Sequence, residues 1–207
     1  DGNLLNRGAS LWFAYNGTMQ SSFFFQGARI REGYNNRLFD QTYFAIEGGF
    51  WPDSNLMLLL STIFGDQIDY ENTRLGKRFR LSPYLTYNLG KHLRLSFDHT
   101  FERMTVHNVH LCTANISQLS TVYQFNVRTF FRAIIQYVNY DYNPSNYTYE
   151  IDPNYKGFFT QLLFSYKINP RTVLFIGYSD NYYGDQDIRL TRSDRTFFVK
   201  LGYAWVF

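Results

Sequence analysis

Hydrophobic and polar residues alternate along most of this chain with a period of two. The alternation is clearest near the C-terminal end, where every second residue is large and apolar: Phe197, Val199, Leu201, Tyr203, Trp205 and Phe207. The positions between them include Thr196, Lys200 and Gly202. Successive side chains point to opposite faces only in an extended strand, so this pattern predicts β-structure rather than helix.

About eleven segments follow this pattern, and most are about 10 to 13 residues long, roughly twice the length of an ordinary strand. They lie near residues 8–16, 20–31, 36–49, 55–66, 78–88, 93–103, 116–125, 128–140, 156–167, 172–183 and 194–207. Strands of this length match those that cross a membrane at a tilt. The sequence therefore predicts an all-β protein, a transmembrane antiparallel up-and-down β-barrel.

The connections between these segments alternate in length. Short turns are predicted near residues 51–55, 89–92, 125–126 and 168–171, and longer polar loops near 66–77, 104–115, 141–155 and 184–193. Short turns on one side and long loops on the other are typical of outer-membrane barrels. In lipid every backbone N–H and C=O must be paired within the protein, which strands achieve only by closing into a barrel.

Charged residues fall on the face opposite the apolar one. We expect this face to line the lumen, with the charged side chains of Arg80, Arg94, Asp98, Glu102, Arg128, Arg132 and Lys200. Asp98 and Glu102 lie about 13 Å apart along a strand, too far for the carboxylate pair of a glycosidase. Interleaved with arginines, they predict a lumenal ladder of salt bridges that fills the pore or sets its ion preference.

The composition narrows the function classes. Hydrophobic residues make up 45%, aromatic residues 20% and charged residues 18%, and mean hydropathy is −0.33. The aromatic content argues against disorder, and the single Cys112 excludes a disulfide scaffold. No run approaches the roughly 20 apolar residues of a membrane-spanning helix. The net charge of +3 is scattered rather than clustered, so a nucleic-acid partner is not expected.

The C-terminal segment also predicts a direction. A terminal aromatic residue after alternating apolar positions, here Phe207, resembles the signal that the barrel assembly machinery reads in bacterial outer-membrane proteins. This resemblance implies that the C-terminus faces the periplasm and that the long loops are extracellular. An odd number of strands then begins at the outer rim, whereas a complete single-chain barrel has an even number. We therefore expect residues 1–207 to be one barrel domain, the C-terminal part of a longer chain, although one miscounted hairpin near 16–36 would restore an even number.

Four stretches, 65–70, 122–132, 167–174 and 195–205, carry a family resemblance. They resemble the C-terminal region of a bacterial family of large outer-membrane proteins, whose N-terminal domain is like carbohydrate-binding module family 9. The family's long C-terminal barrel has no known function. The resemblance implies an N-terminal half before this chain, and it supplies no catalytic residues.

Metal and catalytic motifs are weak. Asp66, Asp69, Asp185 and Asp187 are weak Ca²⁺ candidates in the predicted outer loops, because hard oxygen ligands suit that ion. Solvated loop carboxylates are the alternative interpretation, and no other cofactor is expected. His107, His110 and Cys112 lack the spacing of a structural zinc site. No Gly-x-Ser-x-Gly elbow is present.

Three function classes remain open. The first is an outer-membrane pore or transport component for a small solute or saccharide. The second is a non-conducting anchor or assembly scaffold that displays loops or binds partner proteins. An outer-membrane hydrolase is third, and the sequence leans against an enzyme. The expected partners are outer-membrane lipid and lipopolysaccharide, the barrel assembly machinery during insertion, and other envelope proteins.

Overall fold

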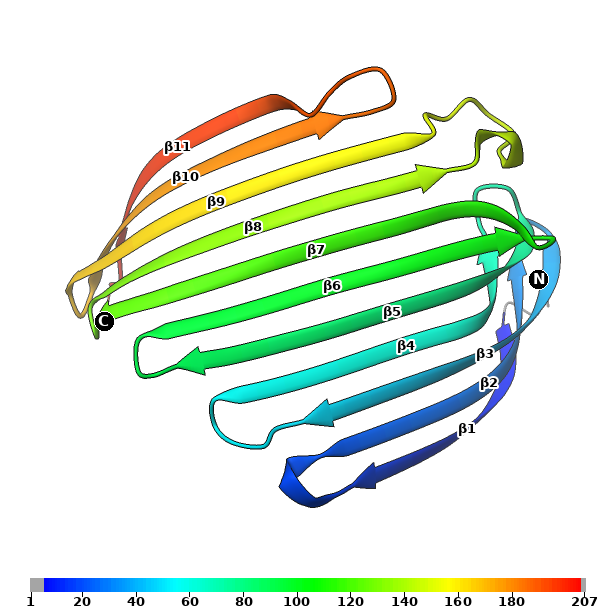
Figure 1. Cartoon of the computed structure of the whole chain (residues 1–207), viewed down its shortest axis with the longest axis horizontal. Coiled ribbons are helices and arrows are strands. Elements are labelled where there is room, and N and C mark those ends of the chain that lie inside the picture. Colours follow the sequence, from blue (N-terminus) through cyan, green and yellow to red (C-terminus); the bar gives the residue numbers. More distant parts are fainter. Residues whose placement is uncertain (1–5, 206–207) are drawn as a thin grey trace.

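The chain forms one antiparallel sheet in which every strand pairs with its neighbours in sequence (Figure 1). The computed structural model describes residues 6–205. Its strands are β1 (Asn6–Asn16), β2 (Ser22–Tyr34), β3 (Arg37–Phe50), β4 (Leu56–Asp69), β5 (Arg74–Leu89), β6 (Leu93–Val106), β7 (Val109–Asn126), β8 (Thr129–Tyr142), β9 (Asn154–Asn169), β10 (Thr172–Gly184) and β11 (Thr191–Tyr203). Two 3₁₀ turns, η1 (Thr18–Gln20) and η2 (Pro144–Asn146), complete the elements. Within the described residues no helix is long and apolar enough to cross a membrane.

The predicted fold class is confirmed, with an 11-stranded up-and-down order. Two of the predicted long loops, 66–77 and 104–115, are wrong. Most of their residues extend β4, β5, β6 and β7, leaving only a turn at 70–73 and a two-residue turn at His107 and Asn108. Both turn residues have positive φ, 50° and 62°, as a tight hairpin requires. Many residues at these strand ends are polar, as loop residues usually are, and this is why the sequence predicted loops here. The turn expected near 125–126 lies at 127–128.

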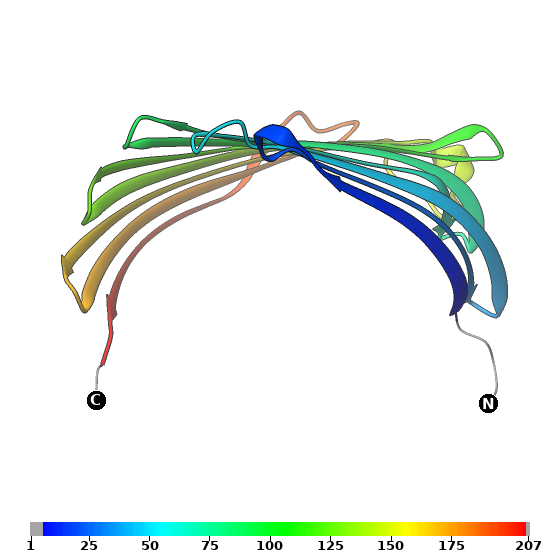
Figure 2. The ribbon, with the colours of Figure 1, turned by 90° about the horizontal axis from the view of Figure 1, so that it is seen from below.

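The sheet curves into an arch with its first and last strands at the two open edges (Figure 2). Within the described residues, β1 pairs only with β2 and β11 only with β10. Because eleven strands alternate in direction, β1 and β11 run the same way.

The strand register separates two faces, which we call the apolar face and the polar face. A row of phenylalanines crosses the apolar face from β2 to β6: Phe25, Phe44, Phe64, Phe79 and Phe101. Phe44 and Phe64 stack with their ring centroids 5.5 Å apart. At the opposite end of the strands, exposed tyrosines lie on the same face: Tyr87, Tyr123, Tyr166 and Tyr203. These two aromatic rows bound an apolar band.

The height of this apolar band matches a bilayer. From Phe79 to Leu89, β5 runs about 33 Å, which spans about 25 Å when the strand tilts by roughly 40°. Beyond the phenylalanine row, the apolar face changes to charged pairs, which we call the ion-pair rim: Arg31–Asp40 at 2.7 Å, Lys77–Asp66 at 3.2 Å and Arg195–Asp180 at 3.0 Å. The chemistry of the outer surface therefore changes at the level expected for the lipid headgroups.

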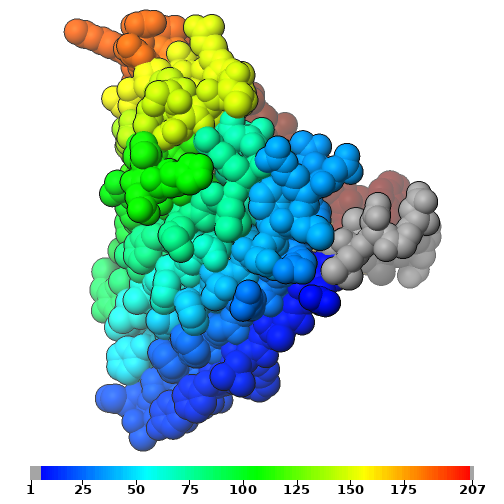
Figure 3. Space-filling view, turned by 90° about the vertical axis from the view of Figure 1, so that its right-hand side faces the viewer, coloured from blue at the N-terminus to red at the C-terminus, as the bar shows by residue number. Residues whose placement is uncertain are grey.

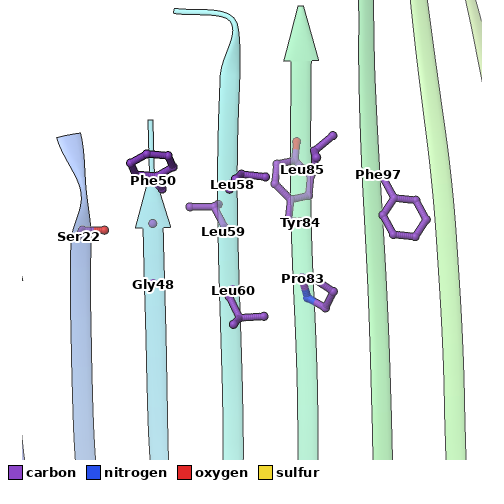
Figure 4. A pocket seen from close by; sticks show the side chains of 11 residues that line it. Ser22, Gly48, Phe50, Leu58, Leu59, Leu60, Pro83, Tyr84, Leu85 and Phe97 are labelled. Carbon is purple, nitrogen blue, oxygen red and sulfur yellow. The ribbon is translucent and has the colours of Figure 1, made fainter. Parts of the chain in front are cut away.

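A shallow apolar hollow lies in this band near the end of β3 (Figure 4). Its volume is about 490 Å³, and its lining includes Leu58, Leu60, Pro83 and Phe97. A side chain at Gly48 would meet nothing within 4 Å, so this glycine adds to the open space. Pro83 has no N–H to donate, and the β5–β6 ladder is interrupted beside it. The hollow suits hydrocarbon chains rather than a polar ligand.

Gly65 lets β3 and β4 approach closely. Its φ is +136°, and a Cβ there would lie 2.4 Å from the backbone oxygen of Thr42. Only glycine accepts both this conformation and this contact without strain.

We expect Gly65→Ala to destabilise the sheet by about 1–3 kcal/mol, because the added methyl group forces strained backbone to shift. Gly48→Ala on the neighbouring strand is the matched control, and it should change the unfolding free energy by less than about 0.5 kcal/mol. Urea titration of protein folded into lipid vesicles measures both values. Equal stability of the two variants would contradict this interpretation of Gly65.

Candidate functional site

Cross-strand polar pairs run along the polar face between β5 and β6. They are Arg80–Glu102 at 2.5 Å, Ser82–Thr100 at 3.2 Å, Thr86–Ser96 at 3.1 Å and Arg94–Asn88 at 2.9 Å. Such pairs form because opposed residues on one face have Cβ atoms only about 5 Å apart. These cross-strand contacts satisfy the hydrogen-bonding groups of polar side chains that the curved sheet partly encloses.

Six of the seven charged residues expected in the lumen share this polar face: Arg80, Arg94, Asp98, Glu102, Arg132 and Lys200. The exception is Arg128, which lies in the turn between β7 and β8. Its backbone N–H donates to the Asn126 side chain at 2.8 Å, a contact that closes the turn. The strand predicted at 128–140 was started one residue too early, because β8 begins at Thr129.

The two carboxylates on β6 have separate surroundings. Glu102 pairs with Arg80, whereas Asp98 lies opposite Tyr84 on one side and Gln118 on the other. On β8, Arg132 donates from Nη2 to Gln161 on β9 at 3.0 Å. This arrangement is a ladder of charges and amides across the strands rather than a paired acid and base.

The connection between β8 and β9, residues 143–153, folds over one end of the polar face; we call it the mouth loop. It reaches across to the β4–β5 turn, where the Tyr149 hydroxyl donates to Glu71 at 2.5 Å and the Thr148 N–H donates to Asn72 at 3.3 Å. Arg74 also donates to the carbonyl of Asn146. Figure 3 shows the mouth loop, in yellow, beside this turn.

A small apolar cluster holds the mouth loop to the sheet. Tyr147 packs against Met104, Val106 and Leu111, which are at most 7% exposed. Burial raises the pKa of the Tyr147 hydroxyl, and the hydrogen bond to Glu71 raises the pKa of Tyr149 to about 12.

Because η2 lies on the inner side of the arch in Figure 2, the polar face that it covers is the concave one.

Six tyrosines form a continuous array at this end of the polar face. In spatial order they are Tyr183, Tyr155, Tyr140, Tyr142, Tyr147 and Tyr149, and consecutive ring centroids lie 5.7–5.9 Å apart. Four come from β8, β9 and β10, and two come from the mouth loop. Sequence reasoning missed this array because tyrosines in a barrel are expected at the membrane boundary.

A hollow of about 530 Å³ lies against the tyrosine array. Carboxylates line it beside the rings: Glu150, Asp152 and Asp185. Tyr183 donates to Asp185 at 2.5 Å, and the backbone N–H of Ile188 does so at 2.6 Å. These hydrogen bonds hold the pKa of Asp185 below its usual range. The hollow offers flat aromatic surfaces and hydrogen-bond acceptors to a polar ligand.

The four weak Ca²⁺ candidates do not converge. Asp66 lies on the apolar face, where it accepts from Thr42 N–H and Lys77, whereas Asp69 lies on the polar face and pairs with Arg74 at 2.9 Å. Asp185 orders its own loop, and the N–H of Asp187 donates to it. Among residues 6–205, no three His, Cys, Asp or Glu side chains gather as metal ligands.

The C-terminal residues lie on the exposed apolar face of β11 and just beyond it. Phe197, Val199, Leu201 and Tyr203 are 53–67% exposed, and Trp205 is 79% exposed. Phe207 lies outside the described residues. The stripe formed by the other five residues is open to lipid or to a binding partner.

Tyr149→Phe should loosen the mouth loop, because it removes the hydroxyl that donates to Glu71. One such hydrogen bond contributes about 1 kcal/mol, so hydrogen–deuterium exchange of residues 143–153 should rise about fivefold. Tyr87→Phe, at the other end of the sheet, is the control. Unchanged exchange in Tyr149→Phe would mean that this bond does not hold the loop.

The β10–β11 loop, residues 185–190, should loosen in acid. Because the folded pKa of Asp185 is lowered, its contribution is complete above the ordinary carboxyl range and is lost as pH falls through the folded value. Exchange of this loop, corrected for the intrinsic pH effect, should rise at low pH in the wild type. In Asp185→Asn it should already be high at neutral pH, and an Asp187→Asn control should resemble the wild type.

Comparisons with known proteins support the fold. No family model matches the sequence, and no curated protein matches it. A similar solved structure is OmpT (in-vitro folded), an outer membrane protein of Vibrio cholerae, with a TM-score of 0.53 and 12% sequence identity. The alignment covers 95% of this chain and 64% of that one. At this identity the likeness concerns the fold alone, which is that of an outer-membrane β-barrel.

Proposed function

We propose that this chain is an outer-membrane barrel domain that passes a small polar solute along its concave face. The observation that carries this proposal is the division of the sheet into a lipid-compatible apolar band and a concave face lined with hydrogen-bonded charges. A barrel that served only as an anchor could fill its interior with apolar side chains. Charged and amide groups such as Arg94, Asp98 and Arg132 instead favour contact with water and polar solutes.

The tyrosine array supports a saccharide or a similar polyhydroxylated solute. Aromatic rings stack against the C–H faces of a sugar ring, and neighbouring carboxylates accept its hydroxyl hydrogens. The hollow beside Tyr155 and Tyr183 offers both kinds of contact at the end of the polar face. The mouth loop narrows this end, so a solute that enters there meets the tyrosines first.

The open edges support a larger barrel in the membrane. In the described part of the chain, the outer edges of β1 and β11 have no partner strand. Unpaired N–H and C=O groups along such edges are costly in lipid. Because both edges run the same way, joining β1 directly to β11 would make a parallel pair. An odd number of additional strands would instead close the barrel with antiparallel pairs throughout, and we expect such strands to complete it. The exposed apolar stripe of β11 is a suitable surface for the barrel assembly machinery during insertion.

Planar-bilayer recording of the full-length protein tests the pore directly. We expect stepwise ion currents, because the polar face would line a continuous aqueous path. Currents that fall when a saccharide is added would support the solute class. A protein that inserts but stays electrically silent would contradict the pore and favour the anchor or scaffold.

The ion preference should depend on charges of the polar face. Replacing Arg94 and Arg132 by glutamine removes two positive charges from this face, so the reversal potential in a salt gradient should shift toward cation preference. Arg128→Gln, in the β7–β8 turn, is the matched control and should have a smaller effect. A shift of the same size in both variants would contradict the assignment of the polar face to the lumen.

A further inference from the structure

Three arginines surround one hollow on the apolar side of the sheet. Arg7 on β1 and Arg29 and Arg31 on β2 line a space of about 410 Å³ together with Asp40 on β3. Arg7 and Arg31 are directly opposite each other in the strand register. Arg29 precedes Arg31 by two residues and therefore lies on the same face.

The charges in this cluster do not balance. Arg31 donates two hydrogen bonds to Asp40, at 2.7 and 2.8 Å, so the one carboxylate among the described residues that line the hollow is engaged by one guanidinium. Three positive charges against one negative charge leave a net charge of +2. Like charges opposite each other on neighbouring strands repel, so an anion between Arg7 and Arg29 would relieve this repulsion.

The cluster lies at the end of the apolar band. Gly27, two residues before Arg29 on the same strand face, is directly opposite Phe44 of the phenylalanine row. Arg29 therefore lies at the level of the ion-pair rim, on the outside of the arch and away from the polar face. In a bilayer this position is at the level of lipid headgroups.

We propose that Arg7, Arg29 and Arg31 bind a phosphate group of an outer-leaflet lipid, namely the phosphorylated sugar headgroup of lipopolysaccharide. Guanidinium groups match phosphate oxygens with two parallel hydrogen bonds each, which makes arginine the preferred residue for such recognition. The bond to Asp40 positions Arg31, while Arg7 and Arg29 supply the unbalanced charge. The adjacent phenylalanine row offers acyl chains an apolar surface. This assignment rests on the proposed outer-membrane location.

The test uses the full-length protein in detergent, with lipid A, dephosphorylated lipid A and inorganic phosphate as separate probes. We expect lipid A to bind at least about tenfold more tightly than dephosphorylated lipid A, and the Arg7→Gln/Arg29→Gln variant to lose a similar factor. Lys91→Gln/Arg171→Gln, in two turns at the other end of the strands, is the matched control and should bind like the wild type. Heat-modifiable mobility on gels shows that each variant is folded.

Asp40→Asn should change lipid A affinity in the opposite direction to the Arg7→Gln/Arg29→Gln variant. It frees Arg31 and removes the negative charge that Asp40 contributes to the cluster, so lipid A affinity should rise. Equal binding of lipid A by the wild type and the Arg7→Gln/Arg29→Gln variant would overturn the site. Inorganic phosphate that binds as tightly as lipid A would overturn the lipid assignment.

Conductance separates this site from the proposed pore. The Arg7→Gln/Arg29→Gln variant should conduct like the wild type, because its changes lie outside the lumen. A silent wild-type protein that still binds lipid A would refute the pore and leave the phosphate site standing.

Discussion

The structure depends on one constraint, the pairing of backbone N–H and C=O groups between neighbouring strands. In water a strand edge can be solvated, but in hydrocarbon each unpaired group costs several kcal/mol. A sheet that meets this constraint needs apolar side chains on its lipid-facing side. Its other face can carry side chains of any kind. The chain uses this freedom: phenylalanine and leucine cover the band, while arginine, aspartate and amides lie on the other face. The same constraint gives the two open edges their importance, because among residues 6–205 β1 pairs only with β2 and β11 only with β10.

Strand number, order and face were predictable because the side-chain period of a strand is fixed by its geometry. Glu102 and Arg80 could be placed on one face without any structure, and they form an ion pair. Strand ends were less predictable, because strands that rise beyond the membrane become polar on both faces. Asp66 and Lys77 therefore resembled loop residues, although they pair across a regular ladder. Arg128 shows the opposite error, since the strand predicted from residue 128 begins one residue later, at Thr129, and Arg128 lies in the turn.

The mouth loop and the tyrosine array were beyond sequence reasoning. Tyr149 and Glu71 are far apart in the chain, and their contact depends on how the β8–β9 connection folds inward. Tyr140, Tyr155 and Tyr183 lie on three strands whose register alone brings their rings together. The excess of arginine at Arg7, Arg29 and Arg31 was likewise hidden, because the scattered charges of the sequence become a cluster only when β1 and β2 are aligned.

The proposed placement in the membrane requires the apolar face to contact lipid and the polar face to contact water. Spin labels placed one at a time at residues 79–89 of β5, in protein reconstituted in vesicles, test it most directly. Labels at odd positions such as Phe79, Leu81 and Leu85 should collide mainly with dissolved oxygen. Labels at even positions such as Arg80, Ser82 and Thr86 should collide mainly with a water-soluble nickel complex. Accessibility that does not alternate, or that alternates in the opposite phase, would contradict this placement of the two faces.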